Sequence, residues 1–85
     1  MTSKVIYRGA LRTEATHIRS GNTIITDAPT DNKGKGEAFS PTDLVATAMA
    51  SCILTIMGIK ANGMNTNIEG ASAEVKKIMG TGRGE

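Results

Sequence analysis

Apolar residues are concentrated between residues 41 and 60, and they occur on every side of a helix drawn through that stretch: Leu44, Val45, Ala48, Met49, Ala50, Cys52, Ile53, Leu54, Ile56, Met57 and Ile59. Ser40 is a suitable N-cap, and Pro41 follows at the first helical position, where its missing N–H costs nothing. Asp43 lies three residues after the cap, as in a capping box. We expect the helix to end at Asn62 and Gly63, with the glycine in the left-handed conformation. The pattern therefore predicts one long helix within residues 39–63, with Ser40 as its N-cap.

A helix that is apolar all round is buried on every side or lies in a membrane. The membrane interpretation is not favoured, because Thr47, Ser51 and Thr55 recur every four residues and interrupt the apolar run. A chain of 85 residues whose aromatic residues are Tyr7 and Phe39 forms only a small core. We therefore expect either that a partner chain covers the helix or that the chain is part of a longer protein.

Three strands are predicted before the helix. Residues 4–8 form a short run ended by Gly9, and residues 10–18 alternate weakly. The run from Thr23 to Thr26 is β-branched throughout, which is typical of a strand. Ser20, Gly21 and Asn22 between the last two runs are turn residues and predict a hairpin. The pattern predicts a three-stranded antiparallel meander.

The segments on either side of the helix are different in kind. Residues 27–37 are polar and glycine-rich but lack the residue order of a phosphate-binding loop, so we expect a mobile flap. Phe39 is placed to pack onto the first helical turn and fix the end of this flap. Residues 66–79 alternate loosely and predict a fourth strand, and residues 80–85 predict a flexible tail. The order β-β-β-α-β predicts a single α+β domain over residues 1–85.

Charge and composition narrow the range of functions. The net charge is +2 and the basic residues are scattered, which does not favour nucleic-acid binding. One cysteine cannot form an internal disulfide, and the N-terminus lacks the apolar segment of a signal peptide. We therefore expect a cytoplasmic protein. His17 is the single histidine, so we expect neither a metal site nor a cofactor.

Cys52, in the middle of the predicted helix, is the first candidate for chemistry. A lone cysteine on an apolar helix is usually a small core residue. Reactivity would require access to a small ligand and a nearby cation that stabilises the thiolate. Arg8, Arg12 and Arg19 on or beside the strands are candidate cations, although an isolated arginine is usually a solvated surface charge. The residues alone leave both interpretations of Cys52 open.

The run Gly-Lys-Gly-Glu-Ala-Phe-Ser-Pro-Thr-Asp-Leu-Val-Ala-Thr-Ala-Met-Ala-Ser-Cys at residues 34–52 resembles the helix start of the OsmC/Ohr family. These are the osmotically inducible and organic hydroperoxide resistance proteins. Leu-Arg-Thr-Glu-Ala-Thr-His-Ile-Arg-Ser-Gly and Thr-Asp-Ala-Pro further upstream resemble the same family. The resemblance extends from about residue 4 to residue 79.

The resemblance implies an intertwined homodimer in which the long helices of both chains pack at the centre under two sheets. It also implies a thiol peroxidase in which Cys52 attacks an organic hydroperoxide and becomes a sulfenic acid. An arginine on the second strand stabilises the thiolate in that family. Alignment on the Ser-Gly turn gives this role to Arg12, with Arg19 as the second choice. Binding of nucleic acid or insertion into a membrane is not implied.

The chain departs from the family pattern at three points. Thr42, followed by Asp43, occupies the position of a family glutamate that holds the arginine. A second, resolving cysteine is missing, so turnover would need an external thiol. The chain is also shorter than family members, as expected of a truncated N-terminal portion. The alternative is therefore an inactive OsmC-like scaffold, or a remnant that binds a small ligand.

Overall fold

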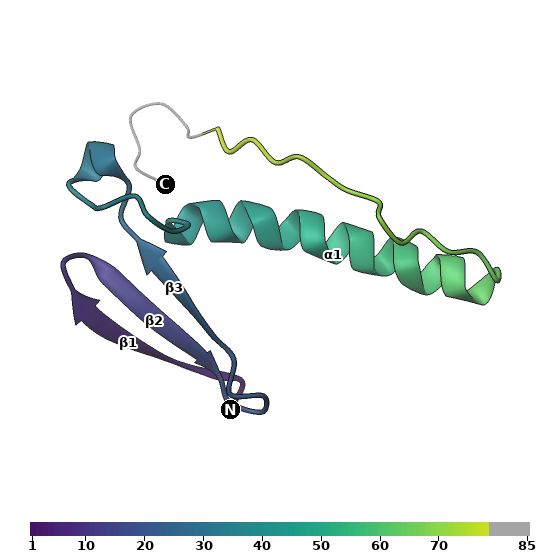
Figure 1. The fold of residues 1–85 in the computed structure, drawn as a ribbon, viewed down its shortest axis with the longest axis horizontal. Helices are drawn as coiled ribbons and strands as arrows, with labels where there is room; N and C mark the ends of the chain where they lie inside the picture. Colours follow the sequence, from purple (N-terminus) through teal and green to yellow (C-terminus); the bar gives the residue numbers. More distant parts are fainter. Residues whose placement is uncertain (79–85) are drawn as a thin grey trace. The chain divides into compact units, whose positions relative to one another are not determined.

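A computed structural model describes residues 1–78 of the chain (Figure 1). The chain forms two compact units, one over Met1–Thr42 and one that starts at Asp43. The first unit holds the three strands β1 (Ser3–Gly9), β2 (Arg12–His17) and β3 (Thr23–Asp27) and a short 3-10 turn at Thr30–Asn32. The second holds the helix α1 (Pro41–Gly63), whose first two residues belong to the first unit. A single domain over residues 1–85 stays a prediction.

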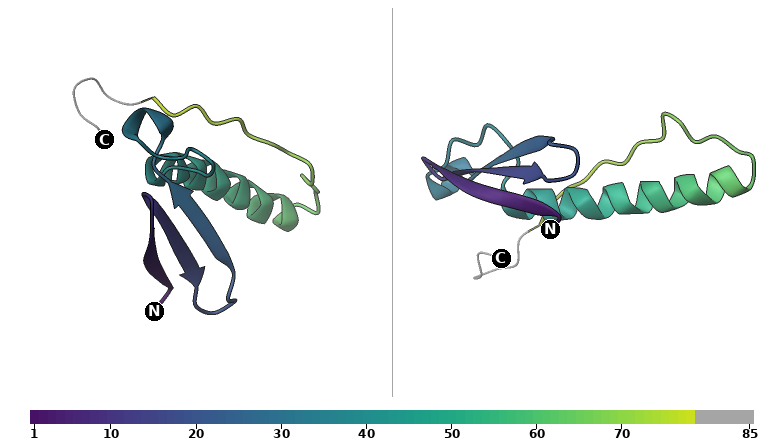
Figure 2. Two further views of the ribbon diagram at one scale, coloured as in Figure 1. Left: turned by 60° about the vertical axis from the view of Figure 1, so that its left-hand side comes forward. Right: turned by 90° about the horizontal axis from the view of Figure 1, so that it is seen from below.

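The first unit is an antiparallel meander with the strand order β1-β2-β3, which Figure 2 shows from two sides. Val5 pairs with Ala15, and Ala15 pairs with Ile24 on the next strand. The structure confirms the predicted three-stranded sheet and the hairpin around Ser20–Asn22. Because directly paired residues on neighbouring strands point to the same face of the sheet, these three apolar residues lie on one face.

The turn between β1 and β2 shifts the start of the second strand. Ala10 and Leu11 have positive φ angles of 55° and 62°, and the pairing register is irregular between Tyr7 and Gly9. The Leu11 N–H donates a hydrogen bond of 3.1 Å to the Tyr7 hydroxyl, which stabilises the turn. A strand was predicted from residue 10, but two left-handed residues cannot continue a ladder, so β2 begins at Arg12.

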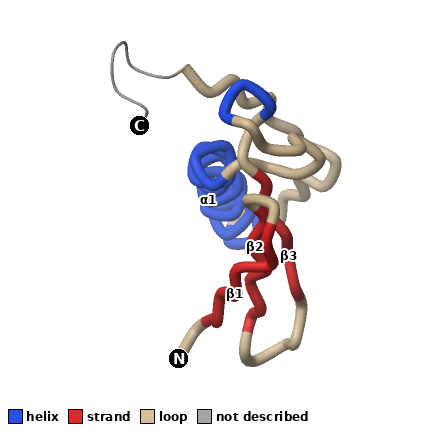
Figure 3. The backbone as a smooth tube through the Cα atoms, turned by 90° about the vertical axis from the view of Figure 1, so that its left-hand side faces the viewer, coloured by secondary structure: helices blue, strands red, loops and turns tan. Residues whose placement is uncertain are grey.

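The segment from Ala28 to Glu37 is a compact turn, drawn in Figure 3 as loop on both sides of the short 3-10 helix at Thr30–Asn32. The Gly36 N–H donates to the Ala28 carbonyl at 3.2 Å, and the Gly34 N–H donates to the Pro29 carbonyl at 2.9 Å. A Cβ atom on Gly34 would lie 1.8 Å from the Ala28 oxygen, so the glycine is required by close backbone approach. These bonds close the loop on itself, and the mobility that the sequence predicted stays a prediction.

The helix α1 begins directly after Ser40 and ends at Gly63, both as predicted, but the residue in the left-handed conformation differs. The Thr66 N–H donates to the Ala61 carbonyl at 2.9 Å, and the Asn65 N–H donates to the Asn62 carbonyl at 3.2 Å. These two bonds form a Schellman motif in which Asn65, with φ 54°, takes the left-handed position. The expectation that Gly63 takes this position is wrong, because asparagine tolerates the left-handed region and lets the helix continue through Gly63.

Side chains of α1 are largely exposed within the single chain. Ala61 is the one buried apolar residue over residues 1–78. The predicted burial of the helix on every side is therefore not met by the chain's own residues. By length and composition alone α1 could cross a membrane, a test that core helices of soluble proteins also pass.

Residues 66–78 contain no strand, so the predicted fourth strand is wrong over the part that the structure describes. Alternation of apolar residues does not make a strand unless a neighbouring backbone satisfies its N–H and C=O groups. In this segment, an ion pair of 2.8 Å joins Lys77 Nζ to Asp43 Oδ1 near the start of α1. Residue 79 and the predicted tail over residues 80–85 lie outside the described residues.

Candidate functional site

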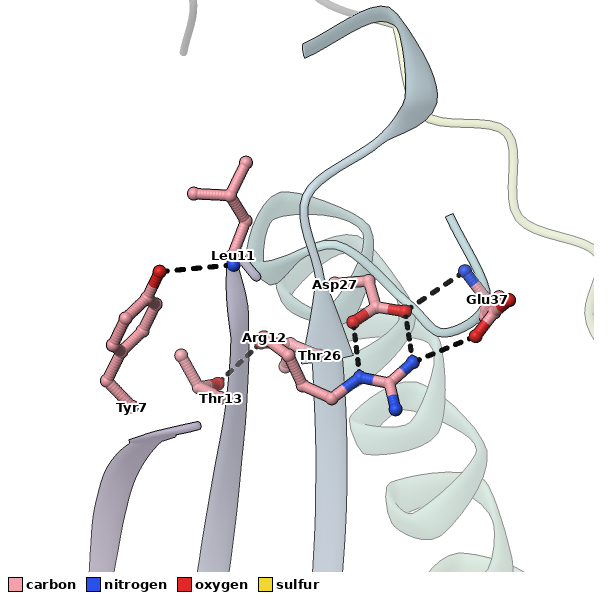
Figure 4. A network of polar contacts seen from close by, with 7 residues as sticks. All are labelled: Tyr7, Leu11, Arg12, Thr13, Thr26, Asp27 and Glu37. Atoms are coloured by element: carbon pink, nitrogen blue, oxygen red, sulfur yellow. Dashed lines mark hydrogen bonds and ion pairs between the residues drawn. The ribbon is translucent and has the colours of Figure 1, made fainter. Parts of the chain in front are cut away.

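The meander places Arg12 beside Asp27. Arg12 is the first residue of β2, Asp27 is the last of β3, and the two are direct partners in the antiparallel register. Arg12 Nε donates to Asp27 Oδ1 at 2.7 Å, and Arg12 Nη2 donates to Asp27 Oδ2 at 2.8 Å (Figure 4). Two parallel, charge-assisted bonds of this length fix the plane of the guanidinium. The hairpin therefore holds Arg12 in one orientation.

Glu37, at the end of the loop before α1, completes the cluster. Its carboxylate accepts a hydrogen bond of 3.1 Å from Arg12 Nη2, and its backbone N–H donates to Asp27 Oδ2 at 3.1 Å. The loop end is thus joined to both members of the ion pair, as Figure 4 shows. We call Arg12, Asp27 and Glu37 the arginine cluster.

Burial within the arginine cluster is uneven. The exposed fraction of the side chain is 0% for Asp27, 27% for Arg12 and 67% for Glu37. The hydrogen bond from Arg12 lowers the pKa of Asp27, although burial opposes this effect; the Glu37 N–H adds to the lowering. The hydrogen bond with Asp27 likewise raises the pKa of Arg12. Asp27 and Arg12 are therefore both ionised at neutral pH.

The other candidate residues lie elsewhere. Cys52 is a free thiol on an exposed part of α1. Arg19 lies in the turn between β2 and β3, at the opposite end of β2 from Arg12. Asp43 pairs with Lys77, and Thr42 Oγ1 lies 3.3 Å from Ser40 Oγ. The carboxylate contacts to Arg12 that were expected from the region of Thr42 and Asp43 are made by Asp27 and Glu37.

Sequence reasoning missed both of these acidic residues. A signal existed for Asp27: counting outward from the Ser20–Asn22 turn pairs Arg12 with Asp27, as the observed register does. No pattern pointed to Glu37, because the loop returns to the sheet through backbone bonds that residue types do not encode. The orientation of Arg12 thus depends on a contact between residues separated by 25 positions.

The geometry limits the chemistry available. Arg12 Nη1 makes no hydrogen bond to any of residues 1–78, so it can donate to an anion (Figure 4). Within the same residues, no group of three or more histidine, cysteine, aspartate or glutamate side chains could hold a metal ion. Of the candidate residues, Cys52 therefore offers a thiol and Arg12 an oriented guanidinium.

Comparison with known proteins gives one strong similarity. A crystal structure from Psychrobacter arcticus 273-4, named for an osmotic stress induced and detoxification response protein, has 65% sequence identity to this chain and a TM-score of 0.93. The match covers 94% of this chain and 58% of that protein. No family model matches the chain, and no curated protein matches it.

This similarity supports the resemblance to OsmC-like stress-response proteins and their α+β fold. The three-stranded antiparallel sheet and one helix of this chain match that neighbour. The chain spans a little over half of the neighbour's length.

Proposed function

We propose that the chain is an OsmC-like thiol peroxidase that reduces organic hydroperoxides through Cys52. The observation that carries this proposal is the free, exposed thiol of Cys52 on α1. Support comes from the 65% identity to a protein named for osmotic stress and detoxification. A free thiol, unlike one held in a disulfide, can attack a hydroperoxide.

The reaction balances in two stages. The Cys52 thiolate attacks the terminal oxygen of the hydroperoxide, so that an S–O bond forms and the O–O bond breaks. The alkoxide leaves and takes up a proton as the alcohol; the sulfur is oxidised to the sulfenic acid while the peroxide is reduced. Because Cys52 is the single cysteine, an external thiol then displaces water to form a mixed disulfide, which a second thiol reduces.

Arg12 is the cation that we assign to the Cys52 thiolate, with Arg19 as the second choice. A guanidinium near a thiol favours the ionised form by direct charge pairing. The arginine cluster supports this assignment, because it holds Arg12 in a fixed orientation with Nη1 left to donate. Thr42 and Asp43 stay candidates for orienting groups at the start of α1.

A second copy of the chain is the partner that we assign to α1. Four exposed apolar residues lie along one side of the helix at spacings of four, four and three: Val45, Met49, Ile53 and Ile56. This spacing is typical of a seam between two helices. A homodimer, which the resemblance implies, would cover the seam. We also propose that the protein is cytoplasmic.

Consumption of cumene hydroperoxide in the presence of dithiothreitol tests the enzyme proposal. The chain should consume the peroxide at a rate proportional to its concentration, and Cys52→Ser should abolish this activity. Thr55→Ala, on the same helix, serves as the control for general damage to α1. Equal consumption by the Cys52→Ser variant would refute the proposal.

An inactive scaffold, or a small-ligand-binding remnant, is the second candidate. The observation in its favour is that Arg12 already contacts two carboxylates, which reduces its ability to stabilise a thiolate. The pKa of the Cys52 thiol separates the two candidates. A value well below the ordinary value of about 8.5 supports the enzyme, and a value at or above it supports the scaffold.

A further inference from the structure

The hairpin turn between β2 and β3, which Figure 2 shows at one end of the sheet, holds a histidine and a serine side chain in contact. His17 is the last residue of β2, and Ser20 lies three residues further on. His17 Nδ1 and Ser20 Oγ are 2.6 Å apart, and both residues are exposed. Both belong to the unit Met1–Thr42, so the contact lies within one compact unit. A hydroxyl within hydrogen-bond distance of an imidazole nitrogen is the arrangement of a nucleophile with its base.

The hydrogen bonds of the turn assign a donor and an acceptor to this contact. The Ser20 backbone N–H donates to His17 Nδ1 at 3.3 Å, which requires that Nδ1 carries no proton. The Ser20 hydroxyl is therefore the donor in the bond of 2.6 Å, and the neutral imidazole carries its proton on Nε2. His17 Nδ1 is thus placed to take up the hydroxyl proton of Ser20.

A second bond suits the negative charge that develops on Ser20 Oγ when this proton leaves. The Asn22 backbone N–H donates to Ser20 Oγ at 3.1 Å. A hydrogen bond to the charged form of a group favours that form, so this donor supports transfer of the proton to His17. A Cβ atom on Gly21 would meet no atom within 4 Å, so the turn is open on the side of the residue that follows Ser20.

The backbone of the turn keeps the two side chains in place. The His17 N–H donates to the Asn22 carbonyl at 2.7 Å, and the Gly21 N–H donates to the His17 carbonyl at 2.8 Å. Gly21 has a φ of 79°, a left-handed conformation that glycine adopts without strain. Because these bonds close the turn without either side chain, the hydroxyl and the imidazole meet on a fixed backbone.

We propose that Ser20 is a nucleophile that accepts an acyl group from small activated esters, with His17 as its general base. Ser20 Oγ attacks the carbonyl carbon of the ester while its proton passes to His17 Nδ1. The bond from this carbon to the leaving oxygen then breaks, and the leaving group takes the proton from His17 as it departs. The products are O-acylated Ser20 and a free alcohol or phenol, so no oxidant or reductant is needed. This activity is separate from the proposed peroxidase function and does not depend on it.

The surroundings of His17 limit the substrate to activated esters. Among residues 1–78, both hydrogen bonds of the His17 ring come from Ser20, and no carboxylate pairs with the imidazole. The pair therefore lacks the third group that stabilises the imidazolium in a full catalytic triad. An ester with a good leaving group reacts without that help, whereas an amide does not.

Acetylation by p-nitrophenyl acetate tests this inference in the 85-residue chain, with each acetylated residue located by tandem mass spectrometry of peptides. Ser72, an exposed serine outside the turn, is the internal reference. We expect Ser20 to be acetylated about 100-fold faster than Ser72, which is the lower end of the contribution of a positioned general base. An advantage of less than about tenfold would overturn the proposal.

Two variants test whether His17 is the base. His17→Gln keeps a hydrogen-bond acceptor beside Ser20 but cannot take up its proton, so Ser20 should then react as slowly as Ser72. Asn22→Ala is the matched control, because it changes a side chain of the same turn and keeps the backbone N–H that donates to Ser20 Oγ; the rate at Ser20 should stay within about twofold.

Wild-type speed at Ser20 in His17→Gln would overturn the general-base role. An equal fall in Asn22→Ala and His17→Gln would overturn it as well, because the rate would then follow the integrity of the turn. Should His17→Gln change the circular dichroism of the chain, the comparison of Ser20 with Ser72 in the wild-type chain decides, since it needs no variant.

Discussion

Replacement of Ile53 by alanine should weaken self-association of the chain. Ile53 is 59% exposed and lies in the middle of the apolar seam of α1. Each of the three carbons removed contributes about 0.8 kcal/mol when fully buried. When this sum is multiplied by the exposed fraction of Ile53, which a partner could cover, the loss of association free energy is about 1.4 kcal/mol per protomer. In a two-fold symmetric dimer the residue occurs twice, so the loss is roughly 3 kcal/mol and Kd rises roughly 100-fold.

Sedimentation velocity over a concentration series measures this Kd directly. The matched control is Thr55→Ala, which lies two residues further on and about 200° around the helix. Its hydroxyl donates to the Ser51 carbonyl of the same helix at 2.8 Å, so its loss should change Kd less than about threefold. A wild-type chain that stays monomeric at micromolar concentration would refute the homodimer. Equal Kd values for Ile53→Ala and wild type would refute the seam.

Three smaller predictions concern the anchors of the fold. The folded state lowers the pKa of Asp27, so the ionised carboxylate stabilises the fold at any pH above the pKa it has in the unfolded chain. This stabilisation is lost as the pH falls through the lower pKa of the folded state. Asp27→Asn should therefore reduce the melting temperature at pH 7 and make the melting temperature decline less steeply in acid. Gly34→Ala should lower the free energy of unfolding in urea by about 1–3 kcal/mol, because its Cβ would overlap the Ala28 carbonyl. In the wild-type chain, amide exchange should show that the Gly34 and Gly36 N–H groups are protected relative to a free peptide. Exchange as fast as in a free peptide would instead support the mobile flap. Asn65→Gly should raise, and Asn65→Ala lower, the unfolding free energy by about 1 kcal/mol each, since only glycine adopts a positive φ without cost; equal stability of both variants would contradict the Schellman assignment.

The sequence was sufficient for those parts of the fold that local patterns encode. β-branched residues and turn residues placed the hairpin, and the cap at Ser40 placed the start of α1 within one residue. A local pattern cannot predict whether a segment forms a strand, because a strand also needs a second strand to pair with. The apolar alternation over residues 66–78 looks like a strand, but those residues have no strand partner in the described part of the chain.

The candidate site was predicted in part for a related reason. Arg12 came from a family resemblance, and Asp27 could have come from the hairpin register. Glu37 could not, since its contact depends on a loop that folds back through backbone hydrogen bonds and closely packed glycines. The charge balance around Arg12 is a property of three separate segments and appears only when they are brought together.

The central claim is that Cys52 reacts with organic hydroperoxides with the help of Arg12. The most direct measurement is intact-mass spectrometry after one equivalent of cumene hydroperoxide, with a dimedone trap for the sulfenic acid. We expect rapid addition of one oxygen at Cys52 in the wild-type chain and clearly slower addition in Arg12→Ala, because the thiolate fraction falls when the guanidinium is removed. A Cys52 that gains no oxygen, or gains it as fast in Arg12→Ala as in wild type, would contradict the account.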